Sequence, residues 1–294
     1  MYLVIGATGP VGMGAEICRQ LRAAGKAVRA LARTTANAER AASLARIGVE
    51  LINGDLKDTR SIREACRGID AVISTASMMV SSQQGDTVEN VDGAGQQALV
   101  DAAEAAGVDA FLYVSFSSHI DRDFPFRNAK RAMEERLKQS RLNYTILRPT
   151  FLMEVWLSPI AGFDFGNARA RIYGRGHNMI TWVSQLDVAR FAVRCLGNSL
   201  ARNATFELGG PEALSPLDAV RVFEEVGGRQ FQLEFVSEEQ LERQQENAQD
   251  SLQRSLAGLC RCYSAGDVID MTATLKTFPM TLISVRDYAH SVLR

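Results

Sequence analysis

The sequence predicts an α/β fold with a doubly wound parallel sheet, followed by a smaller C-terminal α/β lobe. The chain has 294 residues, of which 46% are hydrophobic and 23% charged, so it can bury a large core and is neither disordered nor collagen-like. Short runs that are apolar throughout alternate with amphipathic helical patterns, as in a parallel sheet covered on both faces. A glycine-rich segment separates the first apolar run from the first helical pattern.

Six apolar runs of the first half predict the strands of this sheet. Helical spacing between them predicts the crossovers; in the first helix, Val11, Ala15 and Cys18 recur near the 3.6-residue period and Gly25 ends the pattern. Right-handed crossovers then produce a Rossmann-type sheet. The expected strands cover residues 3–5, 27–32, 49–52, 71–73, 111–114 and 144–147, and the expected helices cover residues 10–24, 58–67, 88–106 and 126–139.

The alternation weakens after Pro149, which marks the expected boundary between two parts of the chain. We therefore expect a Rossmann domain over residues 1–150 and a smaller lobe over residues 151–294, with some elements of the lobe returning to the sheet. Residues 151–172 mix Gly, Pro, Phe and Asp. The clearer elements of the lobe are helices at 185–196, 215–228 and 284–293, strands at 205–208 and 231–235, and a polar helix at 238–256 that we interpret as a solvated cover or an oligomer contact.

The net charge, the hydropathy and the cysteine content argue against several classes of protein. Lys and Arg total 33 against 34 for Asp and Glu, so no net field favours nucleic acid or an anionic membrane. No apolar run has membrane-spanning length, and residues 1–5 lack the basic leader of a signal peptide. Cys260 and Cys262 are too close for the usual zinc spacing, and the other three cysteines are scattered. We expect a cytoplasmic protein with reduced thiols, no metal and no nucleic-acid partner.

The segment from Gly6 to Gly12 has the spacing and context of a phosphate-binding loop. It follows a predicted strand and opens a predicted helix, whose N-terminal N–H groups attract an anion. Gly6 would permit the tight turn, Gly9 the approach of a pyrophosphate, and Gly12 the packing of the helix near the strand. The alternative, a glycine turn that only reverses the chain, explains the spacing less well. The predicted cofactor contacts in this loop are Gly6, Thr8, Gly9, Pro10, Val11 and Gly12.

Arg33 indicates which dinucleotide binds. NAD sites carry an acidic residue near the end of the second strand, but residues 29–35 contain no carboxylate, and Arg33 lies 21 residues after Gly12. A guanidinium there can hold a 2′-phosphate, so the sequence predicts NADP(H). Arg40 is a second candidate, and the alternative for Arg33 is an ordinary solvated side chain.

Two further strand ends contribute predicted cofactor contacts. Asp55 and Leu56 follow the third strand, where Asp55 either accepts a hydrogen bond from adenine or serves as a turn or capping residue. Thr75, Ala76 and Ser77 follow the fourth strand, where small residues permit close approach of the ribose and nicotinamide.

These motifs, together with Tyr-Thr-Ile-Leu-Arg-Pro at residues 144–149, resemble the atypical short-chain dehydrogenase/reductases. Within that group the chain is most similar to NmrA-like proteins, which include isoflavone-reductase-like enzymes, NADPH:quinone reductases and NADPH-binding regulators. The similarity covers residues 1–235 and is most specific over residues 1–150. It implies a Rossmann domain that binds NADP(H), a small substrate lobe, and a backbone near Pro149 and Phe151 that borders the nicotinamide.

At one catalytic position this sequence departs from the pattern of the short-chain dehydrogenases. Short-chain dehydrogenases carry Ser on the fifth strand and Tyr-x-x-x-Lys on the next helix, where Tyr exchanges a proton with the carbonyl oxygen and Lys lowers the pKa of that Tyr. Here Lys130 is retained, but the position four residues earlier is Phe126, which has no acid proton. Ser117 is our choice within residues 115–118. By resemblance Lys130 takes the proton role or binds the ribose; the alternative is an exposed lysine on a charged helix face.

Two neighbouring features stay open from sequence. His119 can donate a proton to a substrate oxygen, but a lone loop histidine is more often solvated or a local hydrogen-bond partner, which is the interpretation we favour. The apolar side chains between Phe151 and Phe165 either line a pocket for a flat aromatic substrate or form the core of the lobe.

We therefore expect an NADPH-dependent reductase that transfers hydride to an apolar carbonyl, quinone or enone. A quinone is attractive without the Tyr, because its delocalised reduced anion can take a proton from water. The alternative is a non-catalytic NADP(H)-binding redox sensor or an assembly or regulatory protein. A nucleotide-sugar epimerase or dehydratase would normally need the Tyr that Phe126 replaces. The expected partners are a small apolar or aromatic substrate and either a second copy of the chain or a regulatory protein.

Overall fold

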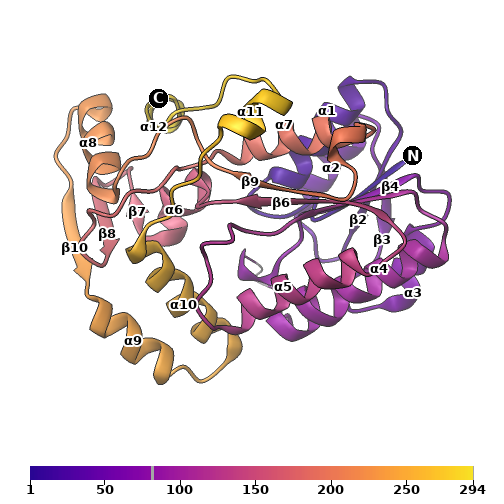
Figure 1. Ribbon diagram of the computed structural model, residues 1–294, viewed down its shortest axis with the longest axis horizontal. Helices are drawn as coiled ribbons and strands as arrows, with labels where there is room; N and C mark the ends of the chain where they lie inside the picture. Colours follow the sequence, from indigo (N-terminus) through magenta and orange to yellow (C-terminus); the bar gives the residue numbers. More distant parts are fainter. Residues whose placement is uncertain (81–82, 294) are drawn as a thin grey trace. The chain divides into compact units, whose positions relative to one another are not determined.

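The computed structural model describes residues 1–80 and 83–293, and its centre is a seven-stranded sheet in the order β3-β2-β1-β4-β5-β6-β9 (Figure 1). All neighbouring pairs from β3 to β6 are parallel. This order confirms the predicted doubly wound α/β sheet. The strands of the sheet are β1 (Tyr2–Ile5), β2 (Val28–Ala32), β3 (Glu50–Asn53), β4 (Ala71–Ser74), β5 (Ala110–Val114), β6 (Asn143–Pro149) and β9 (Ala204–Leu208).

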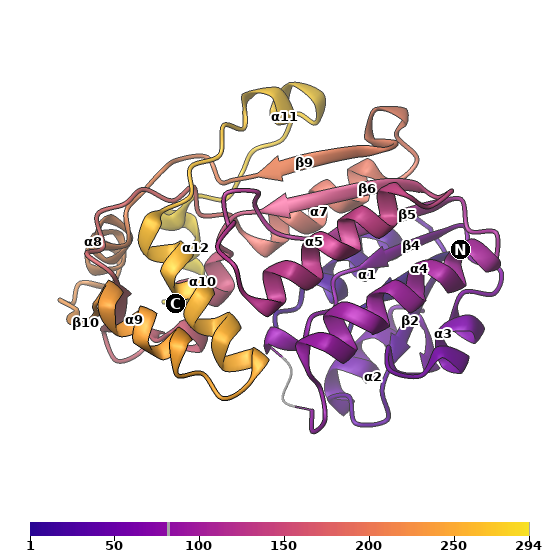
Figure 2. The same cartoon turned by 60° about the horizontal axis from the view of Figure 1, so that its bottom comes forward.

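Helices cover both faces of this sheet, because its central strands are apolar on both sides. In Figures 1 and 2, α3, α4 and α5 lie along one face, and α1 and α7 lie along the other. Figure 2 also shows β9 beside β6 at the edge of the sheet. The helices are α1 (Met13–Ala23), α2 (Ala38–Arg46), α3 (Thr59–Ala65), α4 (Gln96–Ala105), α5 (Pro125–Lys138) and α7 (Gln185–Cys195), with short turns η1 (Met78–Val80) and η4 (Ser199–Ala201).

The remaining elements surround a small three-stranded sheet in the order β10-β8-β7. β8 runs parallel to β10 and antiparallel to β7. These elements are β7 (Phe163–Asp164), β8 (Arg169–Tyr173), β10 (Gln232–Val236), α6 (Met153–Trp156), η3 (Pro159–Ala161), α8 (Pro216–Gly227), α9 (Glu238–Glu246), α10 (Ser251–Ala265), α11 (Thr272–Thr277) and α12 (Val285–Val292).

The contacts divide the chain into two units, each assembled from three segments. The first unit comprises Met1–Ser115, Asn128–Leu147 and Ala189–Phe206, and the second comprises Phe116–Arg127, Arg148–Val188 and Glu207–Arg294. Each unit is described separately below. Among the described residues, no helix combines the length and the apolar character needed to span a membrane.

Three local predictions were wrong or incomplete. The predicted polar helix at 238–256 is two helices, because Asp250 caps a new helix by accepting from the Gln253 N–H. Most residues from 238 to 250 are exposed, as expected of a solvated cover, and the buried Tyr263 lies in the part of α10 beyond the predicted range. The predicted helix at 88–106 begins with a π-helical segment, η2 (Val88–Gly95). A Cβ at Gly95 would lie 2.9 Å from the Leu56 carbonyl oxygen, so this segment passes close to another backbone. Helix α2 was not predicted, although Asn37 caps it.

Candidate cofactor and proton-transfer sites

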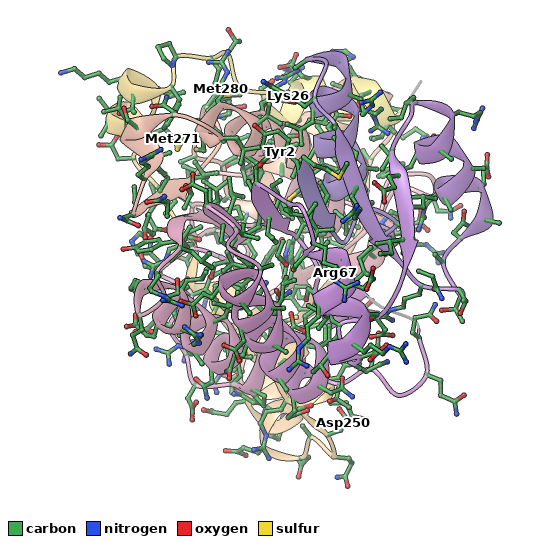
Figure 3. All side chains as sticks on the ribbon, turned by 90° about the vertical axis from the view of Figure 1, so that its right-hand side faces the viewer. Tyr2, Lys26, Arg67, Asp250, Met271 and Met280 are labelled. Carbon is green, nitrogen blue, oxygen red and sulfur yellow. The ribbon has the colours of Figure 1, made fainter. Side chains whose placement is uncertain are left out.

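The parallel register brings the predicted cofactor residues of the first unit to one edge of the sheet. Ile5 pairs with Leu31 of β2 and with Ser74 of β4, and β2 and β3 end level with each other in the same way. Tyr2, Lys26 and Arg67, labelled in Figure 3, mark the opposite edge, at or just before the starts of β1, β2 and β4. Ligands of parallel α/β sheets bind outside the carboxyl ends of the strands. The residues that follow those ends are Gly6, Arg33, Gly54 and Thr75.

The glycine loop has the backbone conformation that its glycines allow. Gly6 has φ +91°, and a Cβ there would lie 2.6 Å from Thr75 Oγ1 and 2.9 Å from the Ala76 nitrogen, which confirms the predicted tight turn. Gly12 also has φ +91°, and its role in packing the helix near the strand stays a prediction. Gly14, which was not predicted, marks a close approach of the helix to the loop, because a Cβ there would lie 2.7 Å from the Gly6 carbonyl oxygen.

Helix α1 begins at this loop without a side-chain cap. Gly12 is its N-cap and makes no side-chain hydrogen bond, whereas Asn37 and Asp58 cap α2 and α3 in the same unit. The loop residues between Thr8 and Gly12 are partly or fully exposed. First-turn N–H groups without a side-chain acceptor fit a pyrophosphate, which would accept from them and benefit from the helix dipole.

Arg33 lies in a cluster of two cations and two carboxylates. Its guanidinium is 2.7 Å from Asp86 Oδ2 and 3.1 Å from Asp55 Oδ2. Lys57 Nζ contacts the same two carboxylates, at 3.7 Å from Asp55 Oδ2 and in a short ion pair with Asp86. The Asp86 side chain is only 1% exposed, so it is the fixed partner of the cluster. Arg33 is therefore not a free solvated side chain, and a 2′-phosphate would replace a carboxylate as its acceptor.

Lys57 and Asp86 were not predicted from the sequence. Lys57 could have been identified from the sequence because it lies two residues after Asp55, in the segment that follows β3. Asp86 lies 53 residues from Arg33, in a segment without a motif. Arg40, the second candidate for the 2′-phosphate, lies exposed on α2.

The other predicted contacts of the first unit have structural partners. Asp55 Oδ1 accepts from the Lys57 N–H at 2.8 Å, so Asp55 acts as a turn residue, and its contact with adenine stays a prediction. The side chain of Leu56 is buried. Thr75 Oγ1 donates to the Ile5 carbonyl oxygen at 3.1 Å. The Ala76 carbonyl oxygen accepts from Gln96, and Ser77 Oγ accepts from the Met79 N–H, so the segment beside Gly6 is held in place.

Lys130 is buried, so the alternative of an exposed lysine on a charged helix face was wrong. Only 4% of the residue is exposed, and its Nζ donates to the Val114 carbonyl oxygen at 3.1 Å and lies 4.8 Å from the Tyr113 ring centroid. Tyr113 pairs in register with Ser74. The Lys130 ammonium therefore lies at the ends of β4 and β5, next to the strand that leads into residues 75–77.

Two buried carboxylates of the first unit act on Lys130. Burial lowers the pKa of the Lys130 ammonium, while the charges of Asp92 and Glu134 oppose that shift. Burial raises the pKa of Asp92, which accepts from the Met78 N–H at 2.9 Å through Oδ2. Its Oδ1 has no hydrogen-bond partner among the described residues, which is unusual for a buried oxygen. Neither carboxylate was predicted from sequence.

In the second unit, Ser117 belongs to a network around the buried carboxylate of Asp267. Ser117 Oγ donates to Asp267 Oδ1 at 3.0 Å, and Thr150 Oγ1 donates to Oδ2 at 2.7 Å. His119 Nδ1 lies 2.9 Å from Oδ1, and the His119 side chain is 55% exposed, so the imidazole is solvated and is also a hydrogen-bond partner, although of a residue distant in the sequence. Asp267 was missed because nothing in its local sequence marks it and 148 residues separate it from His119.

Other predicted residues of this unit have structural roles. The Pro149 carbonyl oxygen accepts from the Ser117 N–H at 2.9 Å. Phe151 packs edge-on against Trp156, with ring centroids 5.0 Å apart. Phe126 is buried against Phe116, at 5.4 Å between centroids, so the Tyr position indeed holds a core side chain.

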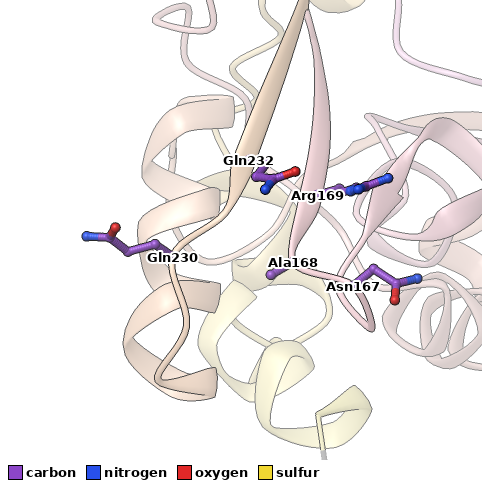
Figure 4. Close-up of a pocket in the computed structure, with 5 residues that line it drawn as sticks. All are labelled: Asn167, Ala168, Arg169, Gln230 and Gln232. Atoms are coloured by element: carbon purple, nitrogen blue, oxygen red, sulfur yellow. The ribbon is translucent and has the colours of Figure 1, made fainter.

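The apolar side chains after Phe151 are largely core. Met153, Leu157 and Phe163 are buried, whereas Ile160 is exposed. A hollow in the same unit, at the β7–β8 turn, is shown in Figure 4. It brings together no acid–base pair and includes none of the predicted site residues. Its lining residues are Asn167, Ala168, Arg169, Gln230 and Gln232.

The family model of the NmrA-like family matches residues 2–277. The chain belongs to the NmrA-like family. A curated relative, a Photosystem II assembly factor (Ycf39) of Cyanophora paradoxa, is 32% identical over 228 residues, which cover 77% of this chain and 68% of the relative. An NAD(P)H azoreductase of Xenophilus azovorans is 27% identical over 243 residues, covering 82% of this chain and 78% of the relative.

The fold of this NmrA-like chain also matches solved structures. An NADPH-dependent quinone oxidoreductase of Escherichia coli, solved with NADPH, superposes with a TM-score of 0.77 over the full length of both chains at 22% identity. At that identity the match shows the shared fold. The predicted cofactor, NADP(H), is the one bound in that neighbour.

Proposed function

We propose that this NmrA-like protein is an NADP(H)-dependent reductase that delivers hydride to a small apolar or aromatic acceptor. The observation that carries the proposal is the carboxyl edge of the sheet in the first unit. There an uncapped helix N-terminus follows a tight glycine turn, and two cations, Arg33 and Lys57, follow the ends of β2 and β3 and share the Asp55 carboxylate, an arrangement that supports recognition of a 2′-phosphate. When bound, NADPH supplies the hydride.

The residues of the first unit divide the binding of this cofactor among them. The N–H groups of Gly9, Val11 and Gly12 accommodate the pyrophosphate, and Arg33 with Lys57 binds the 2′-phosphate. Small residues from Thr75 to Ser77 allow the ribose and nicotinamide to pass close to the backbone. Lys130 holds the nicotinamide ribose from its buried position beside the end of β5. The family resemblance also predicts contacts from Ser117, Pro149 and Phe151; within the second unit the Ser117 hydroxyl donates to Asp267.

The names of the relatives favour a flat, conjugated acceptor. One relative is named an azoreductase, and a structural neighbour is a quinone oxidoreductase. Both names describe acceptors that are planar and apolar. The chain's own acceptor, its cytoplasmic location and its association with a second copy or a regulatory protein remain predictions.

A second candidate function is a non-catalytic assembly or regulatory role with NADP(H) as a bound sensor ligand. The observation in its favour is the Photosystem II assembly factor at 32% identity, together with Phe126 in place of the usual tyrosine. Such a protein would bind the cofactor without consuming it.

Calorimetric titration with NADPH, NADP+ and NADH tests the cofactor assignment, and NADPH oxidation with a quinone, an azo dye and an enone then tests turnover. Tight NADPH binding, much weaker NADH binding and acceptor-dependent oxidation would support the reductase. Tight binding without turnover by any acceptor would favour the sensor. Failure of all three nucleotides to bind would refute both functions.

A further inference from the structure

The small sheet of the second unit ends in a strand whose outer side is unpaired. In the order β10-β8-β7, β10 pairs with β8 and has no strand on its other side among the described residues. Figure 4 shows the two strands side by side, through Gln232 of β10 and Arg169 of β8. The other edge of this sheet, β7, is two residues long, whereas β10 has five. A strand edge with unpaired backbone groups is a template for a further strand, and β10 is the longer of the two edges.

The backbone groups of β10 alternate between the two sides of the strand. The Gln232 N–H donates to the Ala168 carbonyl oxygen at 2.8 Å, so the even-numbered residues of β10 bond toward β8. The odd-numbered residues, Leu233 and Phe235, therefore direct their N–H and C=O groups away from β8. These are the groups that a further strand would bond.

The same two residues carry apolar side chains that are incompletely covered. Leu233 pairs in register with Ala170 of β8, and Phe235 pairs with Ile172, so all four side chains share one face of the sheet. Ala170 and Ile172 are buried, but Leu233 is 38% exposed and Phe235 is 51% exposed. The apolar layer of the sheet thus continues onto β10 and remains open to solvent there. A strand added beside β10 would cover it.

The sequence of β10 lacks the usual protection of an exposed edge. Natural edge strands are blunted by lysine, proline or charged side chains on the inner face, and residues 232–236 contain neither lysine nor proline. The charged residue of the strand, Glu234, lies on the opposite face, where its carboxylate accepts from Arg171 at 3.1 Å. The edge is therefore open both to backbone pairing and to apolar contact.

We propose that β10 pairs antiparallel with β10 of a second copy of this chain, about a two-fold axis at Leu233. This axis places Leu233 opposite its own copy and Phe235 opposite Phe231, all on the apolar face. On the polar face it places Gln232 opposite Glu234, so no two like charges meet across the strands. The strand is complementary to itself, which is what a two-fold interface between identical chains requires.

The hydrogen bonds of this register use the groups that point away from β8. Each Leu233 N–H donates to the Leu233 carbonyl oxygen of the other copy, and each Phe235 N–H donates to the Phe231 carbonyl oxygen of the other copy. The Phe231 N–H stays with Glu224 Oε1, to which it donates at 2.8 Å, so the pairing ends at that residue. The two three-stranded sheets then form one continuous sheet across the axis.

Sedimentation of the full chain over a concentration series tests the pairing. We expect the wild type to move from the mass of one chain, 32.2 kDa, toward twice that mass as concentration rises. Leu233→Lys places two ammonium groups opposite each other at the axis, so the Kd of the dimer should rise more than about tenfold. Leu256→Lys is the matched control, because Leu256 is 46% exposed but lies on α10, and it should keep the wild-type Kd.

Two further variants test the backbone pairing and its register. Leu233→Pro removes an N–H that points away from β8, so it should weaken the dimer while the pairing of β10 with β8 and the thermal stability are kept. Leu233→Cys should form a disulfide between two copies under oxidation, because directly opposed residues of this kind have Cα atoms about 5.5 Å apart, within disulfide range. Leu256→Cys should form no such dimer.

The outcomes against the proposal are equally defined. A wild type that keeps the mass of one chain over the whole series would overturn the second copy as occupant and leave the β10 edge for a strand of another protein. A dimer that persists unchanged in Leu233→Lys and Leu233→Pro would overturn it too, because the copies would then meet at another surface. Thermal melting of each variant shows that a lost dimer is not a lost fold.

Discussion

The ionic cluster around Arg33 and the network around Asp267 stabilise their charged groups with different kinds of partner. Arg33 and Lys57 form ion pairs with carboxylates, and their side chains are 24% and 29% exposed. Asp267 is buried and pairs mainly with hydroxyl groups and one imidazole. A partly exposed cation can exchange a carboxylate for a phosphate at little cost, whereas a buried carboxylate with three donors holds its geometry. The first arrangement suits a ligand that comes and goes, and the second suits a group that must stay oriented.

The largest expected effect tests the fixed part of the cofactor site, the turn at Gly6. Gly6→Ala combines a positive φ with a Cβ 2.6 Å from Thr75 Oγ1, so we expect a loss of about 2–5 kcal/mol in the free energy of unfolding and no NADPH binding. Gly25→Ala is the matched control, because Gly25 has φ +72° and open space around it. It should lose about 1–2 kcal/mol and keep its NADPH affinity. Similar losses in both variants would mean that the contact with Thr75 is unimportant.

The next effect concerns the buried network. Asp267→Ala removes the acceptor of three hydrogen bonds in the second unit, so we expect a loss of about 2–4 kcal/mol in the free energy of unfolding, measured by urea titration. Asp86→Ala is the control from the ionic cluster and should cost less, because Arg33 stays partly exposed. If the two variants lost the same amount, the contrast between the two sites would not hold.

The third effect concerns selectivity at the ionic cluster. Arg33→Ala removes charge-assisted hydrogen bonds to a 2′-phosphate, so NADPH affinity should fall about 10- to 100-fold, corresponding to roughly 1.5–3 kcal/mol. NADH affinity should change by less than about twofold. Calorimetry on Arg40→Ala, which lies exposed on α2, provides the comparison. Equal losses for both nucleotides would refute the assignment of Arg33 to the 2′-phosphate.

The pH dependence of stability sharpens the comparison further. Burial raises the pKa of Asp267, against the opposing hydrogen bonds from Thr150, Ser117 and His119. The folded state therefore holds this proton more tightly than the unfolded state, for which the value is 3.8. The stabilisation of the folded state by the proton on Asp267 is complete below pH 3.8, and it is lost as the pH rises through the raised pKa of Asp267. Relative to Asp267→Asn, the wild type should become less stable over that interval, as urea unfolding at a series of pH values would show; a constant difference would contradict it.

The smallest effect distinguishes competition from support within the ionic cluster. Asp86→Asn removes one of the two carboxylates that occupy Arg33 and Lys57. If that carboxylate competes with the 2′-phosphate, NADPH affinity should rise about threefold, or roughly 0.6 kcal/mol, with no change for NADH. A fall in NADPH affinity would show instead that Asp86 positions the two cations.

The contrast between the two sites also explains which features the sequence could predict. The strands, the turn at Gly6 and the place of Arg33 depend on neighbouring residues: apolar runs, a conformation that only glycine adopts readily, and a count from the loop to the end of β2. Such local rules need no knowledge of the final packing. They did not identify Gly14, which lies outside the spacing of the motif although a Cβ there would lie 2.7 Å from the Gly6 carbonyl oxygen.

The remaining site residues depend on contacts across the fold. Asp267 meets Ser117 across 150 residues, and Asp86 meets Arg33 across 53 residues. Neither carboxylate lies in a motif, and an isolated Asp in a sequence is normally solvated. Lys130 was predicted by its spacing from Phe126, but its burial follows from the packing of α5 over the end of β5, which no residue pattern specifies.

The arrangement of β9 has a consequence for how the chain is synthesised. The first unit is complete only when residues 189–206 have joined it, and β9 covers the edge of β6. After residue 147 has been added to the chain, the ribosome must add about 60 more residues to reach residue 206, which takes about 3–12 s at 5–20 residues per second. During that interval the open edge of β6 is a site for wrong strand pairing. A chaperone that binds exposed strand edges would therefore act on this protein in the middle of translation.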